Sequence, residues 1–240
     1  KYICGQDTIR FAAVDIDLDR HAAIVSILEC KDNSIREVAR HFIKNPKEIN
    51  LRKRNLGRIA LIMLKTCIIH EGFCFKQCEH LRQREKDMGY KVARQITNLA
   101  FGYKCKFISF EHLGTIRPCS RKYSRRSNQK RSYWLKSKIF NNVRNFAFGD
   151  YGILTTRVNP RDTSRLDPWG NTVHRSNEIP LTVIKGSEVY QSGATWVKTA
   201  SGYTSHSGVN ASRNIGIKAI LRHRTNLEFV VNSKQDLEVS

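Results

Sequence analysis

The sequence predicts an α/β fold in which a mixed β-sheet is interrupted by a long helical insertion. Two apolar segments, 9–18 and 21–30, are separated by a short polar turn and predict a pair of adjacent strands. The next clear strand, 105–113, comes only after a long stretch of helical character. With 240 residues, 40% of them hydrophobic, the chain is long enough to bury the core of such a domain.

Three helices are expected between the strand pair and the third strand. Ser34 is followed three residues later by Glu37, a capping-box pattern that favours the start of a helix, and Pro46 is placed to end it. Farther along, apolar residues recur at helical spacing. The three predicted helices span 34–45, 47–69 and 75–101.

The second half of the chain is predicted to return to the sheet and to finish in a helix. Strand 105–113 carries Glu111 near its end, and a basic, polar segment follows it. Between 161 and 207 the pattern changes to short extended pieces and turns. The remaining predicted elements are a helix over 132–148, a strand over 152–160 and an amphipathic helix over 210–221.

The charge of the chain indicates a polyanionic partner. Lys and Arg number 42 against 21 Asp and Glu, which gives a formal net charge of +21. Each contact with a phosphate releases condensed counterions, so such an excess favours nucleic-acid binding. The alternatives are a solvated basic surface or a structural role of the ribosomal-protein kind.

The cysteines and the hydropathy pattern indicate an intracellular protein. The seven cysteines lack the matched pairs of a structural zinc site, because Cys74 and Cys78 have the spacing C-x3-C, so reduced thiols are expected. No signal-peptide layout is present at the first residue, and no segment approaches about 18 uncharged apolar residues, so no membrane association is expected. The predicted location is the cytoplasm, in association with the nucleoid.

Two acidic residues stand at the ends of predicted strands. Asp15 ends the first strand and Glu111 ends the strand after the helical insertion. Carboxylates from separate elements can hold two Mg2+ ions about 4 Å apart, the arrangement that cleaves phosphodiesters. The alternative is that Asp15 caps the hairpin turn and that Glu111 pairs with a nearby arginine.

Four segments in order resemble the RuvC-type domain of OrfB/TnpB-type transposon proteins and type V CRISPR effectors. "AAVDIDLDRHAAIVSIL" resembles the first motif, and "KVARQITNLAFGYKCKFISFEHL" the second. "RRSNQKRSYW" leading to "GILTTRVNPRDTSR", with its VNP-x-x-TS run, is similar to the segment that follows, and "VNASRNIGIKAI" resembles the third motif. The resemblance covers most of 9–221 and implies an RNase H-like fold of the RuvC type.

The resemblance also implies a chemistry and a set of partners. Asp15 matches the first catalytic carboxylate and metal ligand, and Glu111 the second; Asp17 is an alternative for the first, two residues along the same strand. The relatives are RNA-guided DNA endonucleases that cut DNA with two Mg2+ ions. The implied partners are therefore DNA and a guide RNA, and the implied cofactor is Mg2+ if the chain is active.

The sequence departs from the family at the third carboxylate and at the zinc ribbon. The third carboxylate is expected two residues before Asn210, where the chain has Gly208, which offers no ligand atom; Glu178 or Glu188 would have to replace it. The family's two Cys pairs, which hold a structural zinc, are also absent, since no cysteine follows Cys119. The positions near the expected pairs are Asp167, Trp169, Lys198 and Ser201, so zinc is not expected.

A basic segment over 121–131 is predicted to contact nucleic acid. Arginine and lysine side chains suit phosphate contacts, and the tyrosine among them could stack on a base. Arg213, one turn into the last helix, is expected either to approach the nucleic acid or to cap its own helix, and we include it. The predicted nucleic-acid-binding residues are Arg121, Lys122, Tyr123, Arg125, Arg126, Lys130, Arg131 and Arg213.

Together these observations predict a transposon-associated nucleic-acid-binding protein of the RNA-guided endonuclease type, with cleavage lost or impaired. The alternatives are a non-catalytic guided repressor, a structural basic protein, or a transposon remnant. The predicted domains are a RuvC-like core over 1–160 with a helical insertion at about 34–101, a degenerate zinc-ribbon-like insertion over 161–207, and a C-terminal helix and tail over 208–240.

Overall fold

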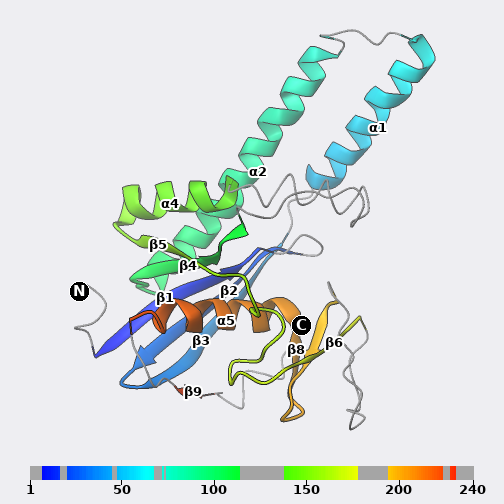
Figure 1. Cartoon of the computed structure of the whole chain (residues 1–240). Coiled ribbons are helices and arrows are strands. Elements are labelled where there is room, and N and C mark those ends of the chain that lie inside the picture. The colour runs from blue at the N-terminus through cyan, green and yellow to red at the C-terminus, as the bar shows by residue number, and fades with distance from the viewer. Residues whose placement is uncertain are drawn as a thin grey trace.

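A six-stranded mixed sheet forms the centre of the protein (Figure 1). The computed structural model describes residues 7–16, 21–44, 48–67, 72, 74–113, 138–177, 194–223 and 228–230. The strands of the sheet are β1 (Thr8–Asp15), β2 (His21–Lys31), β3 (Ser34–Lys44), β4 (Phe107–Glu111), β5 (Leu154–Val158) and β9 (Glu228–Val230). They follow one another across the sheet in the order β5-β4-β1-β2-β3-β9.

The pairing of the strands places the ends of β1 and β4 side by side. β1 and β2 form the predicted antiparallel pair, whereas β4 runs parallel to both β1 and β5. In the β1–β4 register, Ala12 lies opposite Ile108 and Val14 opposite Phe110. Carboxyl ends of parallel strands meet at one edge of a sheet, so the residues that follow Val14 and Phe110 are neighbours.

Helices cover both faces of the sheet. Helices α2 (Phe75–Gly102) and α4 (Lys138–Tyr151) pack on one face, and α5 (Ser207–Ile220) packs on the other (Figure 1). Each face has its own buried apolar cluster, one centred on side chains such as Val92 and Ile108, the other on side chains such as Phe11 and Ile215. The burial of alternate residues on the two faces explains why the central strands are apolar throughout.

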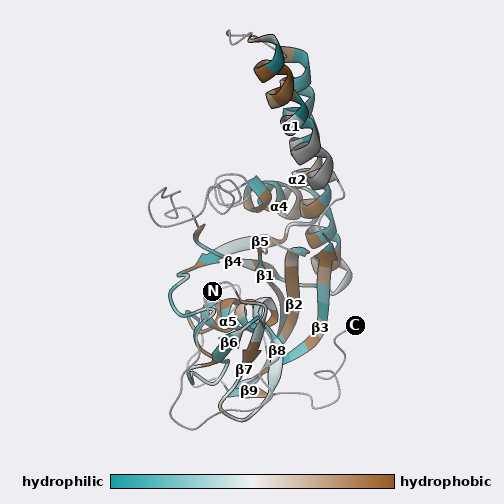
Figure 2. Cartoon of the chain, turned by 90° about the vertical axis from the view of Figure 1, so that its right-hand side faces the viewer, coloured by the Kyte–Doolittle hydropathy of each residue, from teal (hydrophilic) through white to brown (hydrophobic). Residues whose placement is uncertain are grey.

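The helical insertion projects from the body as an arm. Helix α1 (Glu48–Thr66) and the first half of α2 extend away from the sheet (Figures 1 and 2). Leu61, Ile62 and Leu64 of α1 are exposed, and Figure 2 shows apolar residues of this helix in brown. The predicted helices over 47–69 and 75–101 are confirmed by α1 and α2.

The predicted helix over 34–45 is wrong, because this segment is strand β3. β3 is antiparallel to β2 along its whole length, with an irregularity in register opposite Ile27 and Leu28 that leaves Val38 outside the pairing. The two residues of the apparent capping box have other partners: Ser34 Oγ donates to the Lys31 carbonyl, and Glu37 is buried. The helical insertion therefore begins after β3 and not at residue 34.

Helix α5 lies close against the sheet because two glycines face it. A Cβ atom at Gly216 would lie 3.0 Å from Ala13 Cβ and 3.1 Å from the Phe11 ring. Between the two glycines, Ser212 Oγ and Ser26 Oγ of β2 form a hydrogen bond of 2.6 Å. Because Gly208 lies toward the end of β1 and Gly216 toward its middle, α5 runs antiparallel to β1 and begins at the edge where β1 ends.

The segment over 161–206 contains a second, three-stranded antiparallel sheet. Its strands are β6 (His174–Ser176), β7 (Trp196–Lys198) and β8 (Thr204–His206), in that order. This sheet leads directly into α5, which begins at Ser207, three residues before the predicted start. Gly208 therefore lies in the first turn of the helix and not in the loop before it.

Candidate functional site

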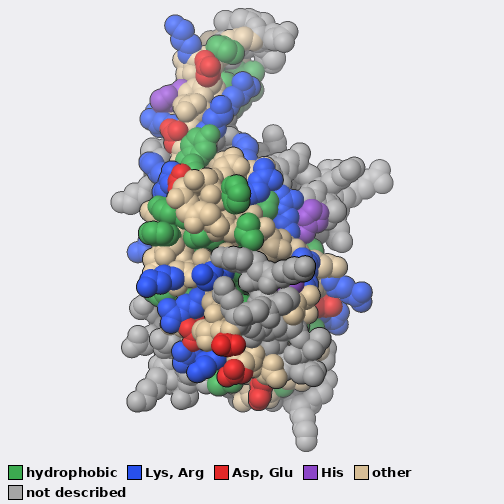
Figure 3. All heavy atoms as spheres, turned by 90° about the vertical axis from the view of Figure 1, so that its left-hand side faces the viewer, with side chains coloured by type: hydrophobic (Ala, Val, Ile, Leu, Met, Phe, Trp, Pro, Cys, Tyr) green, Lys and Arg blue, Asp and Glu red, His purple; other side chains and the backbone are tan. Residues whose placement is uncertain are grey.

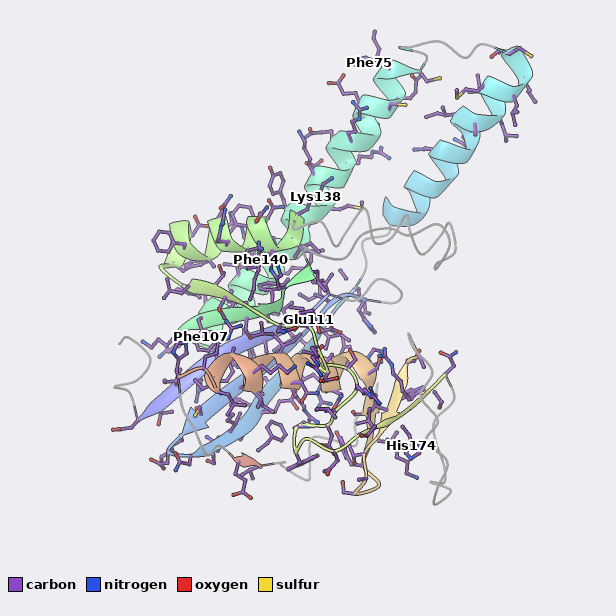
Figure 4. All side chains as sticks on the ribbon, in the orientation of Figure 1. Phe75, Phe107, Glu111, Lys138, Phe140 and His174 are labelled. Atoms are coloured by element: carbon purple, nitrogen blue, oxygen red, sulfur yellow. The ribbon has the colours of Figure 1, made fainter. Side chains whose placement is uncertain are left out.

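Asp15 and Glu111 end neighbouring parallel strands at the edge where α5 begins. Each directly follows a paired residue, Asp15 after Val14 and Glu111 after Phe110, so the register places the two carboxylates side by side. Both residues are half-buried. Figure 4 shows Glu111 at the end of β4, above the first turn of α5. The structure therefore brings together the two acidic residues that the sequence singled out.

Residue 208 faces the Asp15 carboxylate of this pair. A Cβ atom at Gly208 would lie 3.0 Å from Asp15 Oδ2 and would clash with Cδ1 of Ile24 in β2. The position where the third carboxylate is expected therefore lies next to Asp15. The space that a side chain at position 208 would need is filled by Ile24. The helix is capped by His206, whose Nδ1 accepts a hydrogen bond of 3.1 Å from the Gly208 amide.

Glu111 is held by groups of the protein itself. Thr163 Oγ1, in the loop after β5, donates to Glu111 Oε1, and Thr163 is only 1% exposed. Asn214 of α5 fixes that loop, because its Nδ2 donates to the Thr163 carbonyl at 2.8 Å. The VNP-x-x-TS run therefore supplies a hydroxyl that orients the second carboxylate.

Two cations of the protein also act on Glu111. Lys218 donates to the Arg161 carbonyl, and Arg175 donates to the Ala194 carbonyl at 2.9 Å and to Ser207 Oγ at 3.2 Å. Burial raises the pKa of Glu111, and the Thr163 hydrogen bond and the charges of Lys218 and Arg175 offset only part of that rise. The neutral form of this carboxyl is therefore favoured more than in water.

We expect Glu111→Gln to stabilise the protein at neutral pH. A pKa raised in the folded state means that Glu111 contributes stability below its usual value of 4.5 and loses that contribution as the pH rises. Gln remains neutral, so the thermal midpoint at pH 7.5 should rise by about 2–4 °C, the shift that about 1 kcal/mol causes in a chain of this size. The gain should vanish near pH 4.

The matched control is Glu29→Gln, for which the opposite sign is expected. Burial acts to raise the pKa of Glu29, but hydrogen bonds and charges of Arg10 and Arg36 outweigh it, so that pKa is lowered. Its carboxylate therefore stabilises the fold at neutral pH, and the variant should have a lower midpoint there. A lower midpoint for Glu111→Gln at pH 7.5 would contradict a raised pKa for Glu111.

The described residues supply two carboxylates for a metal but not three. Asp15 and Glu111 have the hard oxygen ligands that Mg2+ prefers. In the described ranges, no group of three or more His, Cys, Asp or Glu residues lies close enough together to hold a metal ion. The alternatives Asp17, Glu178 and Glu188 lie outside the described residues. The complete two-metal ligand set is therefore not formed by the part of the chain that the structure describes.

Hydrogen-bonded turns occupy the two places where the family resemblance implies Cys pairs. Asp167 is 3% exposed, and its Oδ1 accepts from the amides of Trp169 at 3.0 Å and Asn171 at 2.8 Å. At the second place, Thr199 Oγ1 accepts from the Tyr203 amide at 3.1 Å and closes the turn between β7 and β8. In both turns a side-chain oxygen orders the backbone.

The prediction that Arg213 contacts nucleic acid is wrong. Arg213 is 2% exposed, and its Nε donates to Glu37 Oε2 of β3 at 3.0 Å. Arg40 also donates to Glu37, at 2.7 Å. The guanidinium of Arg213 is therefore an internal ion-pair partner, and it cannot reach a phosphate outside the protein.

The other predicted nucleic-acid contacts cannot be placed. Arg121, Lys122, Tyr123, Arg125, Arg126, Lys130 and Arg131 all lie outside the described residues. The site also includes residues that the sequence did not single out, namely Thr163, Arg175, His206 and Lys218. Of these four residues, only Thr163 could have been found from the sequence, because it belongs to the VNP-x-x-TS run that resembles the family.

Solved structures share this fold, although no protein-family profile and no curated protein matches the sequence. A Cas12f1–sgRNA–target DNA complex aligns at TM-score 0.56 and 15% identity, over 86% of this chain and 49% of that one. A CRISPR–Cas12f ternary complex aligns at TM-score 0.54 and 15% identity, over 91% and 39%. AacC2c1 bound to sgRNA and extended non-target DNA aligns at TM-score 0.57 and 14% identity, over 75% and 22%.

These likenesses confirm the predicted fold class. The chain spans less than half the length of each of these structures. In the described part of the chain, no helix combines the length and the apolar character needed to cross a membrane. The described part of the chain has the mixed α/β fold that the aligned Cas12f1 and AacC2c1 structures contain, in agreement with the predicted RNase H-like fold class.

Proposed function

We propose that this chain is the RuvC-type part of a TnpB-like, RNA-guided protein that binds nucleic acid and has lost most or all of its DNA cleavage. The observation that carries the proposal is the place of Gly208. A Cβ atom at this position would lie 3.0 Å from Asp15 Oδ2, at the edge where Glu111 also lies. This arrangement supports a nuclease scaffold that keeps two carboxylates and lacks the third.

Nucleic-acid binding is supported by charge and by the partners of the similar structures. The net charge of +21 favours a polyanion, and the aligned Cas12f1 structure contains a guide RNA and target DNA. On the face shown in Figure 3, Lys and Arg side chains are spread over the arm and the body. DNA and a guide RNA are therefore the partners of the proposal, with the cytoplasm and its nucleoid as the place of action.

Weak or absent cleavage is supported by the surroundings of the two remaining carboxylates. Asp15 and Glu111 are the residues that would hold Mg2+, which supplies a metal-bound water and stabilises the leaving oxygen when bound. Glu111 instead accepts from Thr163 and lies near Lys218 and Arg175. Loss of one group from a catalytic set costs about 10²-fold or more in rate.

The proposal is tested by measuring binding and cleavage with the same labelled duplex DNA and RNA hairpin. We expect binding without divalent metal, weakening steeply as KCl rises because the contacts are to phosphates. With Mg2+ and DNA, we expect no cutting above the level of an Asp15→Ala variant, which should bind as well as the wild type. Cutting that Asp15→Ala abolishes would contradict the loss of activity, and an absence of binding at low salt would contradict the function as a whole.

A further inference from the structure

Arg157 of β5 is stacked on an aromatic ring that the core holds in place. Its guanidinium carbon lies 3.8 Å from the centroid of the Phe140 ring, on α4. Phe140 is 8% exposed and makes an edge-to-face contact with Phe110, at 5.3 Å between ring centroids. A guanidinium that lies flat on a fixed ring keeps its N–H donors directed outward along its own plane. Arg157 is therefore pre-oriented to donate hydrogen bonds.

A second arginine, Arg144, lies near Arg157. Arg144 is exposed and follows Phe140 by one helical turn on α4. Burial lowers the pKa of Arg157, and the charge of Arg144 lowers it further, so the two cations lie close together. In the part of the chain that the structure describes, no carboxylate forms an ion pair with Arg144 or Arg157. Two adjacent guanidinium groups of this kind favour an anion between them.

We propose that Arg144 and Arg157 form a phosphate-binding site for the sugar–phosphate backbone of a nucleic acid. This inference rests on the proposed function and adds to it a contact surface away from the carboxylates. Arg157 lies opposite Phe110 in the β4–β5 register, so its side chain is on the α4 face, whereas the next residue of β4, Glu111, is on the α5 face. Figure 4 shows Phe140 and Glu111 on opposite sides of the end of β4.

The chemistry of the site favours a backbone over other occupants. Arginine donates through two parallel N–H groups to a phosphate, and two arginines suit the repeated phosphates of a chain. A second copy of this protein also carries +21, so its approach to a cationic pair is opposed by charge. Neither arginine reads a base, so the contact should not depend on the nucleic-acid sequence.

The site is tested by the salt dependence of binding to a labelled duplex DNA. For Arg144→Ala/Arg157→Ala we expect weaker binding at low salt and a slope of log affinity against log salt that is shallower by about 1.8, or about 0.9 for each phosphate that the variant no longer neutralises. For Arg144→Ala alone, the slope should become shallower by about half of that amount, or about 0.9. Because Arg144 is exposed, the single variant is expected to keep its fold, so a change in its binding cannot be caused by misfolding.

The matched control is Lys104→Ala/Lys106→Ala, which removes two exposed positive charges just before β4, at the end of the strand away from Glu111. We expect its slope to change much less. If the wild type binds and the Arg144/Arg157 variant keeps the same affinity and slope, the site is overturned while the proposed function stands. If the wild type does not bind, the proposed function itself fails. A further measurement is the thermal midpoint with inorganic phosphate at constant ionic strength. If phosphate raises the midpoint of the wild type and not that of the double variant, the site binds a free anion, and its assignment to a nucleic-acid backbone is overturned.

Discussion

Replacing Arg213 with alanine is expected to destabilise the protein by about 3–5 kcal/mol, the cost of breaking a buried ion pair by removing one partner. Arg213 and Glu37 are 2% and 7% exposed, and the variant would leave the buried Glu37 carboxylate with Arg40 as its remaining ion-pair partner among the described residues. Burial acts to raise the pKa of Glu37, but the charges and hydrogen bonds of Arg213 and Arg40 outweigh it, so that pKa is lowered. The ionised pair thus links β3 to α5.

The measurement is equilibrium unfolding in urea at pH 7, with two comparison variants. Arg94→Ala breaks an exposed ion pair with Asp150 and should cost about 1 kcal/mol or less. Arg213→Met/Glu37→Leu removes both charges and should recover much of the stability lost in Arg213→Ala, because no charge remains unpaired at that position. A loss below about 1 kcal/mol for Arg213→Ala would show that the pair does not hold β3 against α5.

The error at β3 shows why local pattern could not identify this strand. Its apolar residues Ile35, Val38, Ala39, Phe42 and Ile43 stand at the spacing of an amphipathic helix. The irregularity of register at Val38 shifts the alternation of inward and outward side chains by one residue. The apolar residues of the strand then recur at the spacing expected of a helix. The ion pair of Glu37 with Arg213 joins residues 176 positions apart, and no local window contains such information.

The site was predictable where it depends on strand ends and not where it depends on loops. Asp15 and Glu111 could be found because an acidic residue after a buried strand is a strong and local signal. The hydroxyl of Thr163 and the cations Arg175 and Lys218 reach Glu111 from three different elements of the fold. The sequence also placed Gly208 before the helix, because the cap is a histidine and not the usual Ser, Thr, Asp or Asn.

The combination of Gly208→Asp with Ile24→Val is expected to produce metal-dependent behaviour that the wild-type protein lacks. A carboxylate at position 208 would stand beside Asp15 and Glu111 and complete a set of three hard ligands. Gly208→Asp alone should fold poorly, because its Cβ would clash with Ile24 Cδ1 and its charge would lie next to Asp15. Valine has no Cδ1, so Ile24→Val removes the clashing atom at a cost of about 0.5–1.5 kcal/mol.

The primary measurement is the thermal midpoint with and without Mg2+, because it needs no guide RNA. Binding to the folded state at about 100 times the dissociation constant adds about 2.7 kcal/mol. The double variant should therefore gain several degrees in Mg2+, and the wild type much less. The second measurement is the cutting of labelled single-stranded DNA, for which we expect a rate at least about 10²-fold above that of the wild type.

Gly208→Asn with Ile24→Val is the matched control, because asparagine has nearly the same shape as aspartate and carries no charge. It should pack as well as the aspartate variant and show neither the Mg2+ stabilisation nor the cutting. Asp15→Ala in the aspartate background should abolish both, since the new carboxylate needs its neighbour on β1. If Mg2+ stabilises the wild type as strongly as the double variant, the two native carboxylates suffice for metal binding, and the absence of a side chain at Gly208 is not what separates this protein from an active nuclease.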